Sequence, residues 1–513
     1  MVTTPARLSR LLQERAAPLI AEHASLALAA RDPALCARDG AGEAQCAAAV
    51  GLIVLCALAG ALTPGLSRAY ALAAGLAFLA AVMLRLSSCA ASVRPRAGRP
   101  LARVDDRLLP PYSIVVALHN EARVARELVR SLDALDYPRA KLDVKLVVEA
   151  HDHATRDALA ALDLPPHYEI VTAPPGAPQT KPRALNVALP LLRGRYVAIY
   201  DAEDAPDPGQ LRGAVARFLE TPERVACLQA QLAIDNVDDS WLTRLYAVEY
   251  AALFDVATHG LARLRWPIPL GGTSNHFRVA TLRRVSGWDA WNVTEDADLG
   301  LRLARFGYRC ETFVSTTREE APARLGAWLR QRRRWAKGWM QTFVTLSRDP
   351  ARLRREVGVR GVVIYALMMV NLSIGPLLSP FFGAALVVDL MRFGPPRPDS
   401  PLSLVEATLW TSVAGLGAVS ILWSATLGMR RRGLGGLWPF LALLPFYYLL
   451  MSAANWAALY DLIARPFHWL KTEHGLARRS RARESTREGA REGAARIGAG
   501  RETAPGGARA AQA

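Results

Sequence analysis

The sequence predicts an α/β domain with a parallel sheet, inserted between membrane-spanning helices. From residue 108 to 347, short runs rich in Val, Ile, Leu and Tyr alternate with segments of helical period, which is typical of βαβ units. Apolar runs flank this region on both sides, several of them near the ~20 helical residues needed to cross a ~30 Å hydrocarbon core. Hydrophobic residues make up 51% of the chain and charged residues 21%. A chain that is part membrane-embedded and part soluble accounts for both fractions.

Two of the apolar runs precede the α/β region. They cover residues 46–63 and 67–86 and are separated only by Pro64-Gly65-Leu66, which predicts a transmembrane hairpin over 46–86. By the positive-inside rule, the arginines that follow place the α/β domain in the cytoplasm of a multi-pass protein of the inner membrane. These arginines are Arg94, Arg96, Arg99, Arg103 and Arg107. Residues 1–45 are expected to form an amphipathic helical lead-in.

Within the domain, strands are expected at 112–118, 143–148, 168–172, 195–200 and 225–230. Val124, Leu128 and Leu132 recur at helical spacing after the first strand, and a later helix is expected to begin with Asp207 as its N-cap. In a parallel α/β sheet, ligands bind at the carboxyl ends of the strands. Functional side chains are therefore expected just after those ends.

Apolar runs return after the domain, at 362–390, 402–427 and 434–463. Prolines interrupt the first and third runs, which fit either kinked single spans or tight pairs, so residues 358–464 are predicted to hold three to five transmembrane helices. Residues 465–475, with Trp469 and Lys471, are typical of an interfacial anchor. The segment 476–513 is rich in Arg, Glu, Gly and Ala, which predicts a disordered basic tail.

Two acidic clusters are candidates for chemistry. Asp201, Glu203 and Asp204 follow the strand expected at 195–200, where carboxylates suit a divalent cation and the phosphate oxygens it binds. Taken alone, such a cluster is more often a helix cap or a solvated turn. Glu295 and Asp296 open a second predicted helix, and capping is a strong alternative there too because the helix dipole favours carboxylates at that end.

A third candidate is the helix that carries Gln331-Arg-Arg-Arg334-Trp335. Trp335 shares an apolar stripe with Trp328 and Trp339, and cationic side chains lie off that stripe. By itself, this pattern is typical of a basic helix lying on a membrane surface.

Seven short segments in fixed order carry a family resemblance. They are Ser113–Glu121, Glu149–Asp152, Thr180–Asn186, Asp201–Asp204, Gly271–Phe277, Thr294–Asp296 and Gln331–Trp335. Together they resemble the signature of the family 2 processive glycosyltransferases, which include cellulose, mannan, hyaluronan and chitin synthases. The resemblance implies a GT-A (Rossmann-like) domain over 108–347 that contains an interfacial helix. Residues 466–475 are also similar to a segment after the last helix of bacterial exopolysaccharide members.

The resemblance further implies a donor and metal site. Asp152, or less favourably Glu149, would contact the nucleobase or ribose, and Lys181 would reach the nucleotide or its diphosphate. Asp201 and Glu203 would hold Mg²⁺ or Mn²⁺ and contact the diphosphate. Because the family usually has DxD, Glu203 is a departure that leaves Asp204 as a substitute ligand.

The catalytic and acceptor residues follow from the same resemblance. Asp296 would be the general base, with Glu295 beside it in the motif. Arg334 would neutralise the leaving diphosphate, and Trp335, in the motif that Gln331 opens, would lie against the acceptor sugar. The remaining substrate-binding candidates are Asn186, Gly272 and His276, the last two in a loop lining the acceptor site.

The reaction implied is an inverting transfer from UDP-glucose or GDP-mannose that lengthens a β-linked polysaccharide and passes it across the membrane. The partners implied are the donor, the growing polymer and membrane lipid, with export subunits left open. Transfer of one sugar to a polyprenyl phosphate or another lipid stays open as an alternative. A transporter is disfavoured because the apolar runs hold few charges. Nucleic-acid binding is disfavoured because the formal charge of +17 is not interleaved with aromatic residues on one module.

Overall fold

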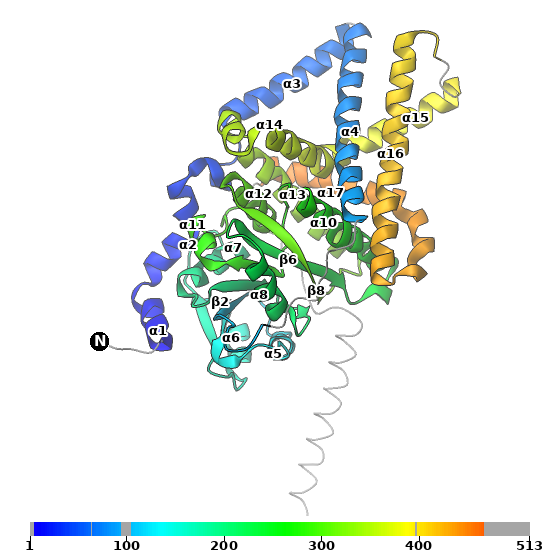
Figure 1. The fold of residues 1–513 in the computed structure, drawn as a ribbon. Helices are drawn as coiled ribbons and strands as arrows, with labels where there is room; N and C mark the ends of the chain where they lie inside the picture. Colours follow the sequence, from blue (N-terminus) through cyan, green and yellow to red (C-terminus); the bar gives the residue numbers. More distant parts are fainter. Residues whose placement is uncertain (1–4, 63, 94–103, 395–397, 466–513) are drawn as a thin grey trace, which may run out of the picture.

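The computed structural model describes residues 5–62, 64–93, 104–394 and 398–465 (Figure 1). The predicted tail at 476–513 and all but the first residue of the predicted anchor at 465–475 lie outside these ranges, as do the arginines at 94, 96, 99 and 103. The α/β domain and helices on both sides of it in sequence fall within them.

The domain is built on an eight-stranded sheet with the order β3-β2-β1-β4-β7-β6-β8-β5. Strands β1 to β4 are parallel to one another, as predicted. The strands are β1 Tyr112–Leu118, β2 Leu142–Glu149, β3 Tyr168–Ala173, β4 Tyr196–Tyr200, β5 Ala205–Pro206, β6 Val225–Ile234, β7 Asn275–Arg278 and β8 Arg309–Glu319.

The second half of the sheet departs from the prediction of a wholly parallel arrangement. Strand β7 lies between β4 and β6 and is antiparallel to both. It occupies part of the segment 271–277, which the resemblance assigns to an acceptor loop. Strand β8 pairs in parallel with β6, yet its polar residues and partly exposed face give no regular apolar alternation, so the sequence did not predict it.

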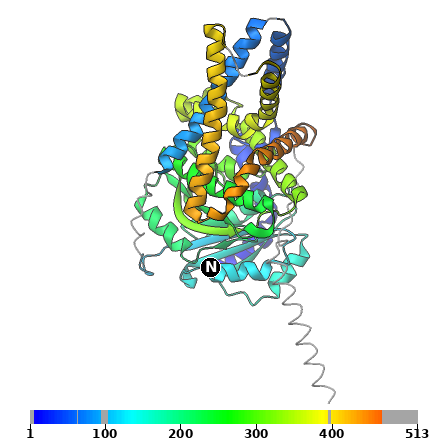
Figure 2. The same cartoon turned by 90° about the vertical axis from the view of Figure 1, so that its right-hand side faces the viewer.

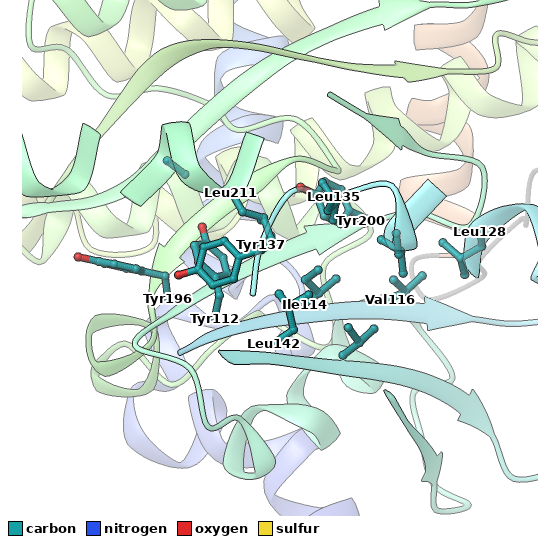
Figure 3. Packing of buried hydrophobic residues seen from close by; sticks show 14 of the residues in the cluster. Tyr112, Ile114, Val116, Leu128, Leu135, Tyr137, Leu142, Tyr196, Tyr200 and Leu211 are labelled. Atoms are coloured by element: carbon teal, nitrogen blue, oxygen red, sulfur yellow. The ribbon is translucent and has the colours of Figure 1, made fainter. Parts of the chain in front are cut away.

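Both faces of the first four strands are buried. On one face, Ile114 and Val116 of β1 pack with Leu128 of α5 (Ala125–Asp133) and Leu211 of α8 (Gln210–Glu220) (Figure 3). On the other face, Val115 packs with residues of α7 (Lys181–Ala188), α11 (Val279–Arg284) and α12 (Glu295–Arg305). Successive side chains of a strand point to opposite faces, so helices are needed on both sides to exclude water.

Helix α8 does not begin as predicted. Its N-cap is Gly209. The carboxylate of Asp207, the residue after β5, instead accepts a hydrogen bond of 2.7 Å from the backbone N–H of Thr316 in β8. Asp207 therefore ties this turn to strand β8 rather than capping the helix.

The predicted lead-in is an integral part of the domain. It contains α1 (Pro5–Arg15), α2 (Ala17–Arg31) and two short 3₁₀ turns, Pro33–Leu35 and Ala37–Asp39, which run along one flank of the sheet layers (Figure 1). Ala24 of α2 is buried in the core beneath α7, and Arg352 binds Asp32 through two hydrogen bonds of 2.9 and 2.5 Å. This segment therefore connects the sheet layers to the helices that follow the domain.

Among the described residues, four helical stretches are long and apolar enough to cross a membrane: 68–93, 350–392, 401–432 and 435–464. The predicted hairpin at 46–86 corresponds to α3 (Glu43–Leu62) and α4 (Pro64–Val93). The later stretches contain α14 (Pro350–Met369), α15 (Gly375–Phe393), α16 (Pro401–Arg432) and α17 (Leu444–Ala464). Helices α4 and α16 lie side by side and project away from the sheet (Figures 1 and 2).

The prolines and glycines mark bends in these stretches. Gly358 of α14 has a φ of +70°, so the helix is interrupted there, and a π-helical turn at Val370–Ile374 joins α14 to α15. Residues 350–392 thus form one bent helical stretch, and the number of membrane spans in it stays a prediction.

The close packing of α16 against the domain can be tested at Gly428. A Cβ at Gly428 would lie 2.5 Å from the backbone carbonyl carbon of Ala251, whereas a Cβ at Gly415 of the same helix meets nothing within 4 Å. Gly428→Ala is expected to lower the free energy of unfolding by about 1–3 kcal/mol because backbone cannot yield as a side chain can. Thermal unfolding in detergent measures this, and Gly415→Ala is the matched control. Equal Tm values for the two variants would contradict the packing.

Candidate active site

A cavity of about 330 Å³ opens at the carboxyl ends of β1, β2 and β4. Most of the residues singled out by the resemblance line it, although they come from six separate segments of the chain. The predicted residues in its wall are Glu149, Lys181, Asp201, Glu203, Gly272, Glu295, Asp296, Gln331, Arg334 and Trp335. The three candidate clusters of the sequence therefore meet in one place.

Lys181, at the first position of α7, lies at the centre of the polar wall. Its ammonium group forms an ion pair with Asp201 and donates a hydrogen bond of 2.7 Å to the carbonyl of Gly272. Burial would lower the pKa of Lys181, but Asp201, Glu295 and Asp296 raise it, so the side chain stays charged. A Cβ at position 272 would lie 3.4 Å from Asp296 Oδ2, which shows how closely backbone and carboxylate approach here.

Glu295 and Asp296 form the first turn of α12. Burial raises the pKa of Glu295 to about 7, and the neighbouring charge of Asp296 adds to this effect. Burial also raises the pKa of Asp296, although Lys181 and Arg334 act against it. Two adjacent carboxylates that both resist ionisation titrate as a coupled pair. A carboxylate with a raised pKa is well suited to accept a proton near neutral pH.

Asp201 and Glu203 follow β4 and face the cavity, but Asp204 does not. The Asp204 side chain is 1% exposed, and its Oδ2 accepts hydrogen bonds from the backbone N–H of Asp201, at 2.7 Å, and from the Thr273 hydroxyl. Asp204 thus braces the turn through Oδ2, and its use as a substitute metal ligand stays a prediction.

The wall chemistry fits a divalent cation. Lys181 and Arg334 face a larger set of carboxylates in the same wall, which are Glu121, Glu149, Asp201, Glu203, Glu249, Glu295, Asp296, Glu319 and Glu320. Within the described ranges, no group of three or more metal-ligating side chains is preformed. Two carboxylates such as Asp201 and Glu203 match the way Mg²⁺ is usually bound when substrate phosphates complete its coordination shell.

Helix α13 (Leu325–Leu346) forms the opposite wall. Gln331 accepts a hydrogen bond of 2.8 Å from the Tyr246 hydroxyl, and Arg334 Nε is buried and has no hydrogen-bond partner in the part of the chain that the structure describes. A Cβ at Gly338 would overlap the Thr294 side chain, so the helix packs directly on the turn before Glu295. Since α13 also packs along α17, it is a shared wall rather than a helix lying only on a membrane surface.

Three predicted substrate-binding residues, Asp152, Asn186 and His276, do not line the cavity. The Asn186 amide donates to the carbonyls of Ala24, at 3.0 Å, and Trp288, at 2.8 Å, and accepts from the Trp288 N–H. His276 is fully buried and contacts the Tyr112 hydroxyl at 2.7 Å, and burial lowers its pKa to about 3. The Asn186 and His276 side chains therefore stabilise the fold through these contacts, which corrects the prediction that they bind substrate.

Asp152 lies beside the cavity as the N-cap of α6 (His153–Ala160). Its carboxylate accepts from the backbone N–H groups of Asn120, at 2.5 Å, and Thr155, at 3.1 Å. Burial opposes its ionisation, but these hydrogen bonds lower its pKa. Asp152 thereby fixes the loop after β1, whose His119 and Glu121 do line the cavity.

Helix α9 (Trp241–Tyr250) and the π-helical turn Ala251–Ala257 form an aromatic wall that was not predicted from the sequence. Tyr246 and Tyr250 have ring centroids 4.7 Å apart, and Tyr250 and Phe254 are 5.2 Å apart. All three line the cavity with Trp335. Their spacing of four residues was a visible signal. Glu319, the last residue of β8, and Glu320, which follows it, were not predicted because strand β8 itself was not predicted.

A family model described as "Glycosyltransferase like family 2" matches residues 110–338. Residues 110–338 are therefore similar to the glycosyltransferases that this model describes. The match covers the whole sheet and most of the cavity wall, including Gln331, Arg334 and Trp335.

Two curated relatives are similar to more than half of this chain. Beta-monoglucosyldiacylglycerol synthase of Trichormus variabilis is 27% identical over 322 residues, 60% of this chain and 64% of the relative. Probable glucomannan 4-beta-mannosyltransferase 7 of Oryza sativa subsp. japonica is 24% identical over 298 residues, 55% of this chain and 50% of the relative. The chain thus spans less than two thirds of the length of each relative.

Among solved structures, the mannosyltransferase PcManGT from Pyrobaculum calidifontis, in complex with GDP-Man and Mn²⁺, is similar with a TM-score of 0.51 and 22% identity. The similarity covers 77% of this chain and 99% of that structure. It concerns the fold, which is the mixed α/β fold of the GT-A type.

The second prediction concerns pH. Since the pKa of Glu295 is raised to about 7 by burial and by Asp296, the coupled pair gains a proton as the pH falls through that value, and a base in this pair is lost. Transfer is therefore expected to rise with pH through about 7. Glu295→Gln removes the charge beside Asp296, so the acidic limb should move to lower pH. A profile of initial rate against pH for both proteins measures the shift, and an unmoved limb would refute the coupling.

Proposed function

We propose that the glycosyltransferase domain transfers a sugar from a nucleotide-sugar donor to an acceptor hydroxyl by a single displacement that inverts the anomeric centre. The observation that carries this proposal is the convergence of Asp201, Asp296 and Trp335, from three distant segments, on one cavity. Each cluster alone has a structural explanation, but their meeting around Lys181 does not follow from capping or membrane contact.

On this proposal, the donor lies along the carboxyl edge of β1, β2 and β4. Asp201 and Glu203 would hold Mg²⁺ or Mn²⁺, which would supply charge neutralisation for the diphosphate. Lys181 would contact the diphosphate from the other side, and Glu149 would lie towards the nucleoside at the end of β2. The relatives' names mention glucosyl and mannosyl products, in keeping with UDP-glucose or GDP-mannose as donor.

The acceptor would approach from the wall formed by α9 and α13. Asp296, with Glu295 beside it, would remove the proton from the attacking hydroxyl, and Trp335 would present a ring face to the acceptor sugar. Arg334, whose Nε has no hydrogen-bond partner in the described chain, would meet the charge that develops on the leaving diphosphate. With an α-linked donor, inversion gives a β-linkage.

The acceptor we favour is the end of a growing polysaccharide that crosses the inner membrane, with the domain in the cytoplasm. Tyr246, Tyr250 and Phe254 line the cavity together with Trp335, and aromatic side chains would suit contacts with the sugars of a polymer. A lipid acceptor is the second candidate, because Leu232, Leu253 and Leu270 give the same cavity an aliphatic stretch, and one relative is named for a glycolipid product.

The proposal is tested by incubating membranes that contain the full chain with radiolabelled UDP-glucose or GDP-mannose and the metal. Label retained in a polymer that a β-specific endoglycanase digests is the expected result. Label in a single organic-soluble glycolipid would select the second candidate. No incorporation from either donor, in membranes where the folded protein is present, would overturn the proposal for these donors.

The third prediction separates the base from the metal ligand. Asp296→Asn is expected to lower transfer by about 10²–10⁴-fold, the usual contribution of a general base, while metal-dependent nucleotide binding persists. Asp201→Ala should instead weaken that binding. Calorimetric titration of nucleoside diphosphate with Mn²⁺ measures binding beside the transfer assay. Full turnover by Asp296→Asn would remove Asp296 from the mechanism.

A further inference from the structure

One buried cation, Arg332, lies directly behind the cavity and outside its lining. Its guanidinium binds both oxygens of Glu249 in α9, with Nη1 and Nη2 each at 2.6 Å. Nη2 also donates to the Tyr447 hydroxyl of α17 at 3.1 Å, and that hydroxyl donates to Glu249 at 2.5 Å. A guanidinium, a carboxylate and a phenol thus link three helices, and Arg332 is only 4% exposed.

Three aromatic rings enclose the same cation. The Arg332 Cζ atom lies 4.4 Å from the ring centroid of Tyr246, 4.8 Å from that of Trp335 and 5.3 Å from that of Trp328. Distances below about 6 Å are typical of cation–π contacts, which gain strength when water is excluded. Trp328 is itself fully buried and donates a hydrogen bond of 3.3 Å to Tyr447. The rings of Tyr246 and Trp335 therefore share one support.

Several of the groups linked by Arg332 also line the cavity. Trp335, Tyr246 and Glu249 all line it, and Gln331 is held by the Tyr246 hydroxyl at 2.8 Å. Burial alone would lower the pKa of Arg332, but Glu249 raises it, so the cation persists. Without the guanidinium, Glu249 would become an uncompensated charge next to the aromatic wall, and the Trp335 ring would lose the flat group behind it.

We propose that Arg332 is a positioning residue for sugar transfer: it holds the Trp335 ring and the Glu249 carboxylate in the acceptor wall and ties both to Tyr447 of the apolar helix α17. This inference rests on the proposed function. Arg332 acts through Trp335 and touches no reacting atom. Its loss would therefore loosen the acceptor while leaving the donor in place, and water would take the place of the acceptor hydroxyl.

The chain offers a matched control. Arg333, the next residue of α13, also forms a two-point ion pair with a carboxylate of α17, that of Asp461. On a helix, Arg332 shares a face with Trp335 at a spacing of three residues, whereas Arg333 does not. Arg332→Lys and Arg333→Lys therefore each weaken a two-point ion pair between α13 and a neighbouring helix, α9 for Arg332 and α17 for Arg333, and only the former reaches Trp335.

The fourth prediction is the ratio of nucleoside diphosphate released to sugar incorporated, measured with the full chain in membranes. Lysine cannot hold both oxygens of Glu249 or lie flat against the rings, so Arg332→Lys should raise this ratio by about fivefold through donor hydrolysis. Tyr447→Phe, which keeps the ring, should raise it by about twofold. Arg333→Lys should keep the wild-type ratio even if its total rate falls. Nucleotide affinity should be unchanged in all three.

An unchanged ratio in Arg332→Lys, or an equal rise in Arg333→Lys, would overturn the inference while the proposed function stands. Thermal unfolding of each variant accompanies the assay, and if Arg332→Lys does not fold, the ratio in Tyr447→Phe decides in the same way. Wild-type protein that released nucleotide without incorporating sugar into any product would instead overturn the proposed function, and this inference with it.

Discussion

The ion pair between Lys181 and Asp201 lies in a cavity lined by many carboxylates, which would otherwise repel one another more strongly. Carboxylates at the end of β2, after β4, in α12 and at the end of β8 line one cavity of about 330 Å³. Because these carboxylates are at least partly buried, ionising each of them costs more free energy than it would in water. A single ammonium at the start of α7 offsets part of this cost. The rest of the architecture, including the bare backbone at Gly272 and the inward turn of Asp204, keeps these groups close together.

Helix α13 connects this charged wall to the apolar helices. Its Gln331, Arg334 and Trp335 line the cavity. Its Arg332 binds Glu249 of α9 and Tyr447 of α17, and its Arg333 forms an ion pair with Asp461 of α17. At the far end, Gly338 lets it sit on Thr294, directly before the Glu295–Asp296 pair. A rigid helix thus sets the distance between the proposed base and the proposed acceptor wall.

The first half of the sheet and the composition of the cavity could be read from the sequence, because β1 to β4 are buried on both faces and their ends carry chemically distinctive residues. Strand β8 could not, since its half-exposed, polar sequence depends on pairing with β6. The errors at Asn186 and His276 share a physical reason. A polar side chain inside a motif can serve the fold through hydrogen bonds to distant backbone, such as Ala24, that sequence order does not reveal. Likewise, the Asp207 carboxylate accepts a hydrogen bond from Thr316 of β8 instead of capping α8.

The first forty residues bear on how this domain can be handled apart from its membrane helices. Ala24 and Leu28 are buried against the domain, Asn186 and Trp291 donate hydrogen bonds to the backbone carbonyls of Ala24 and Ser25, and the Asp289 carboxylate accepts from the N–H of Ala37 at 2.6 Å. A fragment cut at residue 104 would expose that apolar surface and remove the hydrogen bonds that Asp289 accepts from the Ala37 N–H and the Cys36 thiol. Such a fragment would need residues 5–40 supplied as a separate peptide. This N-terminal segment thus packs as part of the domain, although helices α3 and α4 separate it from the domain in sequence.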